Sequence, residues 1–347
     1  MKTLFRTLLI FTLTLLITSA VFAEEPCCCG PQLKLNGFLD GSYSGNFDQK
    51  TNGFSFDQAE IDIQSKLGER GSLRADVEWV NDGTGTMTAN LEQGYMAIDV
   101  PCRIHPFNFM FGKFNAPIGL ELLDPNEMYQ YSHSLLFDYG LPTNLTGGRL
   151  NFDFGKGVDL AAYVVNGWDE NTDMNSQKTV GGRLGFAPCE ALAGGVSGIT
   201  GVEGDDTQSF TRTVFDVDLM TTKIDKLYLG AEVNIGSVDI NDETFSWTGF
   251  MIKGHYDFTD WLGLTGRFDM MDDGDNYLFG GNDAVTGEPL NQSRSSFTLC
   301  PTFVLGPNMG ALIEYRMDMS DAEVFMDKDG KPMDSQSTIA AEMTYSF

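Results

Sequence analysis

Positive charge is scarce in this chain: 22 lysines and arginines stand against 49 aspartates and glutamates, which gives a formal net charge of −27. A nucleic-acid partner requires basic side chains that neutralise phosphates, so we expect no nucleic-acid binding. Histidine is rarer still, with three residues in the whole chain. His133 stands beside Ser134, but sequence neighbours rarely form a nucleophile–base pair and a third orienting group is not evident. We therefore expect no enzyme, no catalytic residues and no cofactor.

Long hydrophobic runs are absent beyond the N-terminus. Residues 1–23 combine the basic residues Lys2 and Arg6 with an apolar run and small residues, which is typical of a signal peptide. Cleavage after Ala23 fits best, and cleavage after Ala20 is the alternative. No later run reaches the roughly 18 apolar residues of a transmembrane helix. The sequence therefore predicts an exported chain that has no membrane-spanning helix.

Cysteine is limited to six residues, and the spaced C-x-x-C pattern of zinc sites is absent. Three cysteines stand together in a Cys-rich N-terminal segment, residues 24–32. Export permits disulfides, so we expect this triplet to be linked to one or both of two cysteines in predicted short turns. The candidate disulfide cysteines are Cys27, Cys28, Cys29, Cys102 and Cys189. Free thiols and a metal at the triplet are alternatives, but we assign no metal site.

The dominant pattern is a two-residue alternation of apolar and polar side chains over segments of about ten residues. Between Leu73 and Trp79, for example, apolar residues alternate with Arg74, Asp76 and Glu78. A soluble β-sandwich also alternates in this way. However, many evenly spread strands in an exported chain favour a transmembrane barrel, because a sheet can span lipid only when it closes on itself. The final residue, Phe347, ends an amphipathic strand, as expected for such a barrel.

The pattern predicts an all-β fold: an antiparallel barrel over residues 33–347 with about sixteen strands, fourteen or eighteen being alternatives. Every second link is short, and the intervening links are mostly longer, including 115–142, 272–293 and 319–335. Bacterial barrels have short periplasmic turns and long external loops in this order. Aromatic residues near strand ends suit girdles at the membrane interfaces: Phe152, Phe154, Phe258, Trp261, Phe303 and Tyr345.

Several segments resemble the β-barrel porin type 2, OmpL-like family. They are Leu35–Asp40, Gly112–Gly119 with Glu121, Ser134–Pro142, Asn144–Gly147 and Asn166–Asp169. The resemblance covers nearly the whole mature chain and is concentrated in residues 106–185. It implies an outer-membrane channel with no assigned substrate and no catalytic residues.

The third external link, residues 115–142, is the candidate constriction loop, because a long loop in a compact fold is usually functional. In many large porins the third loop folds into the channel. The candidate constriction residues are the loop acids Glu121, Asp124, Glu127 and Asp138, and the strand bases Arg74, Arg149, Arg183, Arg212, Arg267 and Arg316. Opposed acids and bases would set a transverse field across a pore. Alternatively, these charges pair with neighbouring wall residues.

We expect an outer-membrane porin for passive diffusion of small polar solutes and ions, with a mild cation preference from the acid excess. The alternative is a non-conducting structural or adhesion barrel that binds through its loops. The expected partners are outer-membrane lipid, the barrel-assembly machinery that would recognise Phe347, and further copies of the chain in a homotrimer.

Overall fold

The alternation of apolar and polar residues builds long strands in the computed structural model, which describes residues 33–102, 105–205, 207–281 and 290–347. In β12 (Glu243–Asp257), buried and exposed residues alternate along most of the strand. One face of each such strand points into the barrel and the other points outward. The predicted signal peptide, residues 1–23, and the Cys-rich segment, residues 24–32, lie outside the described residues.

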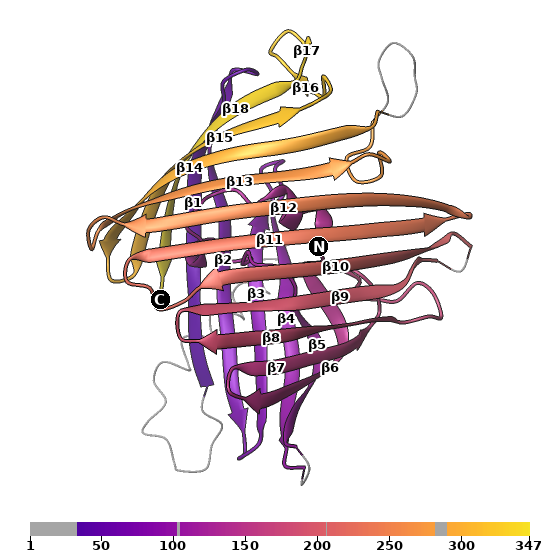
Figure 1. Ribbon diagram of the computed structural model, residues 1–347. Coiled ribbons are helices and arrows are strands. Elements are labelled where there is room, and N and C mark those ends of the chain that lie inside the picture. The colour runs from indigo at the N-terminus through magenta and orange to yellow at the C-terminus, as the bar shows by residue number, and fades with distance from the viewer. Residues whose placement is uncertain (1–32, 103–104, 206, 282–289) are drawn as a thin grey trace, which may run out of the picture.

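Sixteen strands close into one antiparallel barrel (Figure 1). Closure occurs where β1 (Leu33–Asn46) pairs with β18 (Ser335–Ser346) on one side and with β2 (Thr51–Leu67) on the other. The remaining barrel strands are β3 (Gly71–Asn81), β4 (Met87–Val100), β5 (Phe107–Asn115), β6 (Asn144–Gly155), β7 (Val158–Val165), β8 (Thr179–Cys189), β9 (Leu192–Gly204), β10 (Ser209–Thr221), β11 (Leu227–Ile240), β13 (Leu262–Asp273), β14 (Gln292–Gly306) and β15 (Met309–Ser320). The predicted closed all-β barrel of sixteen strands is confirmed.

Four short elements lie outside the barrel wall. They are η1 (Pro125–Glu127), η2 (Leu136–Gly140), β16 (Phe325–Met326) and β17 (Pro332–Met333). The two helical turns belong to the link between β5 and β6, whereas β16 and β17 form a hairpin in the link before β18. No helix in the described part of the chain is long and apolar enough to cross a membrane.

The links differ in length at the two ends of the barrel. At one end the strands are joined by two to six residues, as in 156–157 and 101–106. At the other end lie the four longest links, residues 116–143, 166–178, 274–291 and 321–334. Because β18 starts at the long-loop end, the C-terminus lies at the short-turn end. This arrangement agrees with the short and long links expected from the sequence.

The outer surface is apolar, and aromatic side chains gather on it near the short turns. Phe154, Phe258, Trp261 and Tyr345 are each about half exposed and stand close to strand ends. Such a band suits the boundary between hydrocarbon and water. The inner face instead carries buried charged side chains, including Arg267 and Asp269.

Close contact between neighbouring strands requires glycine at one position of β5. Gly112 adopts a φ of +138°, and a Cβ added there would lie 2.2 Å from the Gly94 carbonyl oxygen and 2.7 Å from the Tyr95 Cα. Gly112 pairs with Tyr95 on β4 and with Gly147 on β6. A side chain at this point would therefore push two hydrogen-bonded strands apart.

We predict that Gly112→Ala lowers the thermal stability of the barrel, because both the backbone angle and the space exclude a methyl group. The loss should be about 1–3 kcal/mol, within the usual range for backbone strain. The measurement is the temperature at which the folded band is lost on an unheated denaturing gel. Gly266→Ala is the matched control, since nothing lies within 4 Å of its added Cβ. Equal melting of the two variants would contradict the prediction.

Candidate functional site

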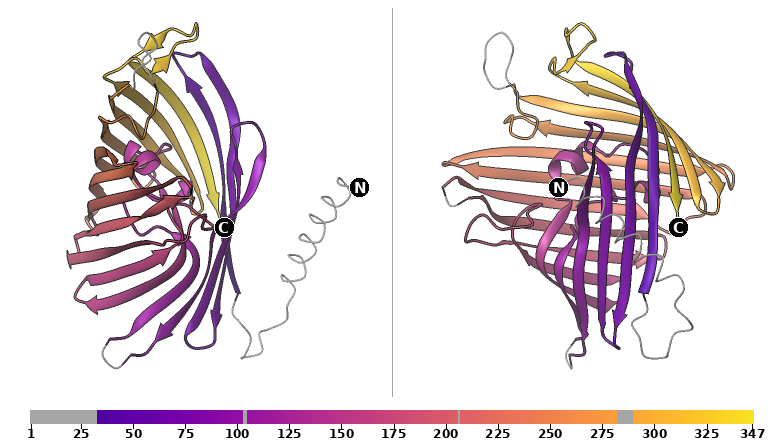
Figure 2. Two further views of the ribbon diagram at one scale, coloured as in Figure 1. Left: turned by 90° about the vertical axis from the view of Figure 1, so that its right-hand side faces the viewer. Right: turned by 180° about the vertical axis from the view of Figure 1, so that it is seen from behind.

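The link between β5 and β6, residues 116–143, folds into the barrel instead of projecting from its rim (Figure 2). Its first helical turn, η1, contacts β1 and β18, and its second, η2, contacts β11, β12 and β13. These two groups of strands occupy separate parts of the wall. The inner loop, as we call residues 116–143, therefore crosses the interior, and any solute that traverses the barrel must pass it.

Apolar packing holds the inner loop in place. Side chains of the loop and the wall form a buried cluster; the loop contributes Ile118, Leu120, Leu135, Leu136 and Leu141, and the wall contributes Phe114, Leu145, Tyr163, Val165, Trp247, Met251 and Met271 among others. A fully buried leucine contributes roughly 1.5–3 kcal/mol relative to an exposed one. The inner loop is thus a packed part of the interior.

A buried ion cluster fastens the same loop to β12 and β13. The Glu121 Oε1 atom lies 3.1 Å from Nη1 of Arg267 and 3.4 Å from Nζ of Lys253. Arg267 also donates to the backbone oxygens of Ser132 and His133, and to the Asp269 carboxylate at 2.9 Å. The guanidinium therefore connects two parts of the loop to the wall.

The ion cluster determines whether the Glu121 carboxyl group is ionised. Burial by itself would raise the pKa of the carboxyl, but the charges of Arg267 and Lys253 and the Ser134 N–H bond outweigh it and lower the pKa to about 2. Glu121 is therefore ionised and fully paired at neutral pH. Removing one member of such a buried pair leaves an uncompensated charge, which is strongly destabilising.

Wall carboxylates also bind the backbone of the inner loop. Each accepts hydrogen bonds from loop N–H groups that the loop itself leaves unpaired. Glu232 accepts from Leu120 at 2.8 Å, Glu314 from Tyr131 and Ser132 at 2.9 and 3.1 Å, and Asp269 from Leu135 at 3.0 Å. Charge-assisted bonds of this kind are roughly twice as strong as neutral ones. Three strands of the wall thus hold the loop backbone.

The arginines expected on the pore wall are mostly paired with acids. Arg74 bonds Asp62 and Asp76, Arg183 bonds Asp218, Arg267 bonds Glu121 and Asp269, and Arg316 bonds Asp318. Arg149 instead donates to Asn151 at 2.6 Å, and Arg212 stacks 4.5 Å from the Trp168 ring centre. Within the described residues, the direct loop–wall ion pair among the candidates joins Glu121 to Arg267, and it is closed and buried, so these charges follow the alternative in which they pair with their neighbours.

The other three loop acids occupy different surroundings. Asp124 is half-buried, and burial together with nearby carboxylates, Glu92 first, raises its pKa to about 8. Glu127 is exposed in η1. Asp138 lies in η2 and lines a cavity at the long-loop end. Only part of the predicted acid set is therefore open to solvent.

Carboxylates without basic partners gather on the wall formed by β1, β2, β4 and β18. This acidic wall, as we define it, comprises Asp40, Asp57, Glu60, Glu92 and Glu342, and none of the five forms an ion pair within the described residues. Four of them are almost completely buried, and Asp57 is half-buried. Sequence reasoning did not single out this group.

Two register shifts explain why Asp57 and Glu92 were missed. Asp57 is the extra residue where β1 pairs Asp40 with Gln58 and Gly41 with Phe56. Glu92 is the extra residue where β3 pairs Asp76 with Gln93 and Val77 with Leu91. A β-bulge redirects a side chain against the alternation of its strand. A strict two-residue period therefore gives the wrong face for one residue beside each bulge.

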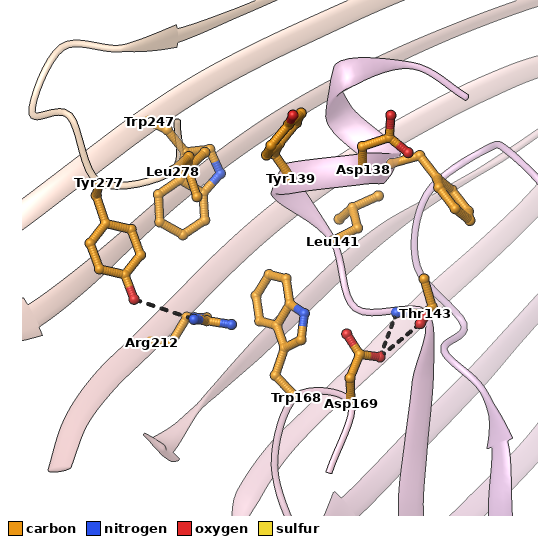
Figure 3. A pocket seen from close by; sticks show the side chains of 11 residues that line it. Asp138, Tyr139, Leu141, Thr143, Trp168, Asp169, Arg212, Trp247, Tyr277 and Leu278 are labelled. Carbon is orange, nitrogen blue, oxygen red and sulfur yellow. Dashed lines mark hydrogen bonds between the residues drawn. The ribbon is translucent and has the colours of Figure 1, made fainter. Parts of the chain in front are cut away.

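A cavity of about 660 Å³ lies between the inner loop and the long-loop end of the wall (Figure 3). Arg212 lies between Trp168 and Tyr277, and its guanidinium donates to the Tyr277 hydroxyl at 3.3 Å. On the other side Asp169 accepts two bonds from Thr143, at 2.8 and 2.9 Å. The cavity thus combines aromatic faces with Arg212, which forms no ion pair within the described residues.

The cysteine prediction concerns the short-turn end. Cys102 lies in the link 101–106 and Cys189 ends β8, and both are exposed. Cys27, Cys28 and Cys29 lie outside the described residues, so the proposed linkage stays a prediction.

We predict that Glu121→Gln destabilises the protein by about 3–5 kcal/mol, since it leaves Lys253 buried without its acid and Arg267 with Asp269 as its remaining acidic partner. The melting temperature should fall and the inner loop should become accessible to protease. Glu127→Gln is the matched control, because Glu127 is exposed and belongs to the same loop. Identical melting and cleavage of the two variants would exclude the ion cluster as an anchor.

Acid should not release the Glu121 anchor until the solution is very acidic. Its pKa is depressed to about 2 in the folded state, from an ordinary value of 4.5. The stabilisation is therefore complete above about pH 4.5 and is lost only as the pH falls through about 2. Hydrogen exchange of the Ser134 amide, which donates to Glu121 at 2.7 Å, should remain slow at pH 5 after correction for intrinsic rates. Rapid exchange there would contradict this assignment.

Comparison with solved structures supports the fold. The chain is similar to OmpT of Vibrio cholerae, with a TM-score of 0.67 and 13% identity over 93% of this chain and 100% of that one. It is also similar to the outer membrane channel DcaP of Acinetobacter baumannii, with a TM-score of 0.67 and 12% identity over 94% and 100%. The anion-selective porin from Comamonas acidovorans aligns with a TM-score of 0.64 and 8% identity over 92% and 100%. No curated protein matches the sequence.

The family comparison covers the complete barrel. The model of the family described as beta-barrel porin-2, OmpL-like, matches residues 32–347. That range contains all sixteen strands, the inner loop and the acidic wall. The chain therefore belongs to the OmpL-like beta-barrel porin-2 family and is an outer-membrane porin.

Proposed function

We propose that this porin is a passive diffusion channel for small polar solutes and ions that prefers cations. The observation that carries the proposal is the acidic wall: Asp40, Asp57, Glu60, Glu92 and Glu342 lack basic partners in the described residues, whereas most wall arginines are paired. Unbalanced carboxylates in a cavity with low-dielectric walls attract cations and repel anions. The formal charge of −27 acts in the same direction.

The cavity beside the inner loop supports passage of solutes that have both polar groups and an apolar face. Trp168, Trp247 and Tyr277 provide aromatic surfaces, and Arg212 provides hydrogen-bond donors. The inner loop acts as the constriction, since it crosses the interior on the side of this cavity that faces away from the long-loop end. The selectivity of the Comamonas acidovorans porin is not transferred, because at 8% identity the likeness concerns the fold.

Export and assembly follow from the same proposal. Residues 1–23 act as a cleaved signal peptide, and Phe347 serves as the recognition point for the assembly machinery. A homotrimer is supported by OmpT of Vibrio cholerae, for which a trimer form has been solved.

The proposal predicts steady single-channel steps in planar bilayers, with a reversal potential in a potassium chloride gradient that indicates cation preference. The double variant Asp57→Asn/Glu342→Gln should move the reversal potential toward zero, because it removes two carboxyl groups from the acidic wall. Asp225→Asn, in the link between β10 and β11, is the control of equal chemistry away from that wall.

Two results would count against the proposal. Silence at high protein load would favour the non-conducting structural or adhesion barrel. An unchanged reversal potential in the double variant would remove the acidic wall from the selectivity mechanism while leaving the channel itself in place.

A further inference from the structure

Glu60, Glu92 and Asp124 bring three carboxylates to one point between the wall and the inner loop. One oxygen of each lies within 4.8 Å of the others. Glu60 comes from β2, Glu92 from the bulge in β4, and Asp124 from the residue before η1. Three carboxylates from three separate segments repel one another unless protons or a cation occupy the space between them.

The hydrogen bonding of Glu60 points to a missing ligand. Glu60 is 1% exposed, and neither of its carboxylate oxygens has a hydrogen-bond partner. One oxygen of Asp124 is likewise buried without a partner. Buried polar atoms are normally satisfied, so an unpartnered carboxylate directed at two others requires an explanation. An isolated buried carboxylate is costly unless it is paired or coordinates a metal.

The basic residues nearby are directed elsewhere. Arg74 donates to Asp76 and Asp62, which form a second carboxylate group with Glu60. The Nζ atom of Lys113 donates to the backbone oxygen of Leu91 at 2.8 Å. Glu92 receives a neutral hydrogen bond from Asn115 at 2.9 Å, which fixes its orientation without neutralising its charge. No described side chain therefore supplies the positive charge between the three carboxylates.

We propose that Glu60, Glu92 and Asp124 form a binding site for a divalent cation, best suited to calcium, that ties the inner loop to the acidic wall. All three donors are oxygen atoms, which suit hard cations such as calcium and magnesium over zinc or copper. Calcium accepts about six to eight oxygen ligands in flexible geometry, whereas magnesium requires a near-ideal octahedron with bonds of about 2.1 Å. Three carboxylates from three separate segments, with one oxygen of each within 4.8 Å of the others, suit the ion that tolerates irregular ligation.

The site goes beyond the proposed channel function, since binding does not depend on conductance. The bound ion would neutralise Glu60 and Glu92, two members of the acidic wall, and hold η1 against β2 and β4. The other acids of the wall, Asp40, Asp57 and Glu342, would remain available to attract mobile cations. Calcium would thus stabilise the position of the inner loop opposite the Glu121 anchor.

The test is calcium titration by calorimetry on the complete detergent-solubilised protein in chelator-treated buffer near neutral pH. We expect one calcium per chain and a rise in melting temperature on calcium addition. Glu60→Gln/Glu92→Gln should weaken calcium binding by at least about tenfold and abolish the melting shift. Asp57→Asn/Glu342→Gln is the matched control, with two carboxyl groups removed from the same wall, and should retain both responses.

The possible outcomes distinguish failure of the calcium site from failure of the proposed cation selectivity. Equal calcium uptake by Glu60→Gln/Glu92→Gln and the wild type would overturn the proposal, and so would no uptake by the wild type at millimolar calcium. If Glu60→Gln/Glu92→Gln fails to fold, Asp124→Asn on the inner loop takes its place, with the same loss expected. A porin that binds calcium but shows no cation preference in bilayers would contradict the proposed selectivity and leave this site intact.

Discussion

Every backbone N–H and C=O group in hydrocarbon must find a partner within the protein, and this requirement organises the whole molecule. A sheet meets it only by joining its first strand to its last, as β1 and β18 do here. Closure gives the sheet an outside and an inside. Because successive side chains of a strand alternate between these faces, each apolar residue placed in lipid brings a neighbour into the interior, where charge can accumulate.

Charged side chains of the interior are balanced near β12 and β13 but not near β1, β2 and β4. Along β12 and β13, arginine and lysine side chains meet acids from both the wall and the inner loop, and the cluster around Arg267 is closed and balanced. Along β1, β2 and β4, acids outnumber bases, and carboxylates such as Glu60 have no partner. The inner loop contacts both the balanced cluster around Arg267 and the acidic wall, which lacks basic partners within the described residues.

The sequence predicts the strands well because, in a closed barrel, the side chains of each strand alternate between lipid and the interior. This alternation appears in the sequence as a two-residue period. The expected long links 115–142, 272–293 and 319–335 differ little from the observed links 116–143, 274–291 and 321–334. The interior is harder to predict, because pairing depends on neighbours across strands. Glu121 looked like an acid facing open space, although Arg267, far away in sequence, closes over it. Asp57 and Glu92 break the period at bulges that no local pattern indicates.

The contacts of the inner loop also constrain the order in which the molecule can form. The Tyr131 hydroxyl lies 3.3 Å from the Ser42 hydroxyl on β1, and Asn126 donates to Ser346 on β18 at 3.2 Å. These two strands come from opposite ends of the chain and meet only at the final seam. The surface that receives this part of the loop does not exist before the seam closes. Docking of this part of the inner loop therefore follows the pairing of β1 with β18. A barrel in which these two strands have not yet paired has an inner loop that is not yet docked.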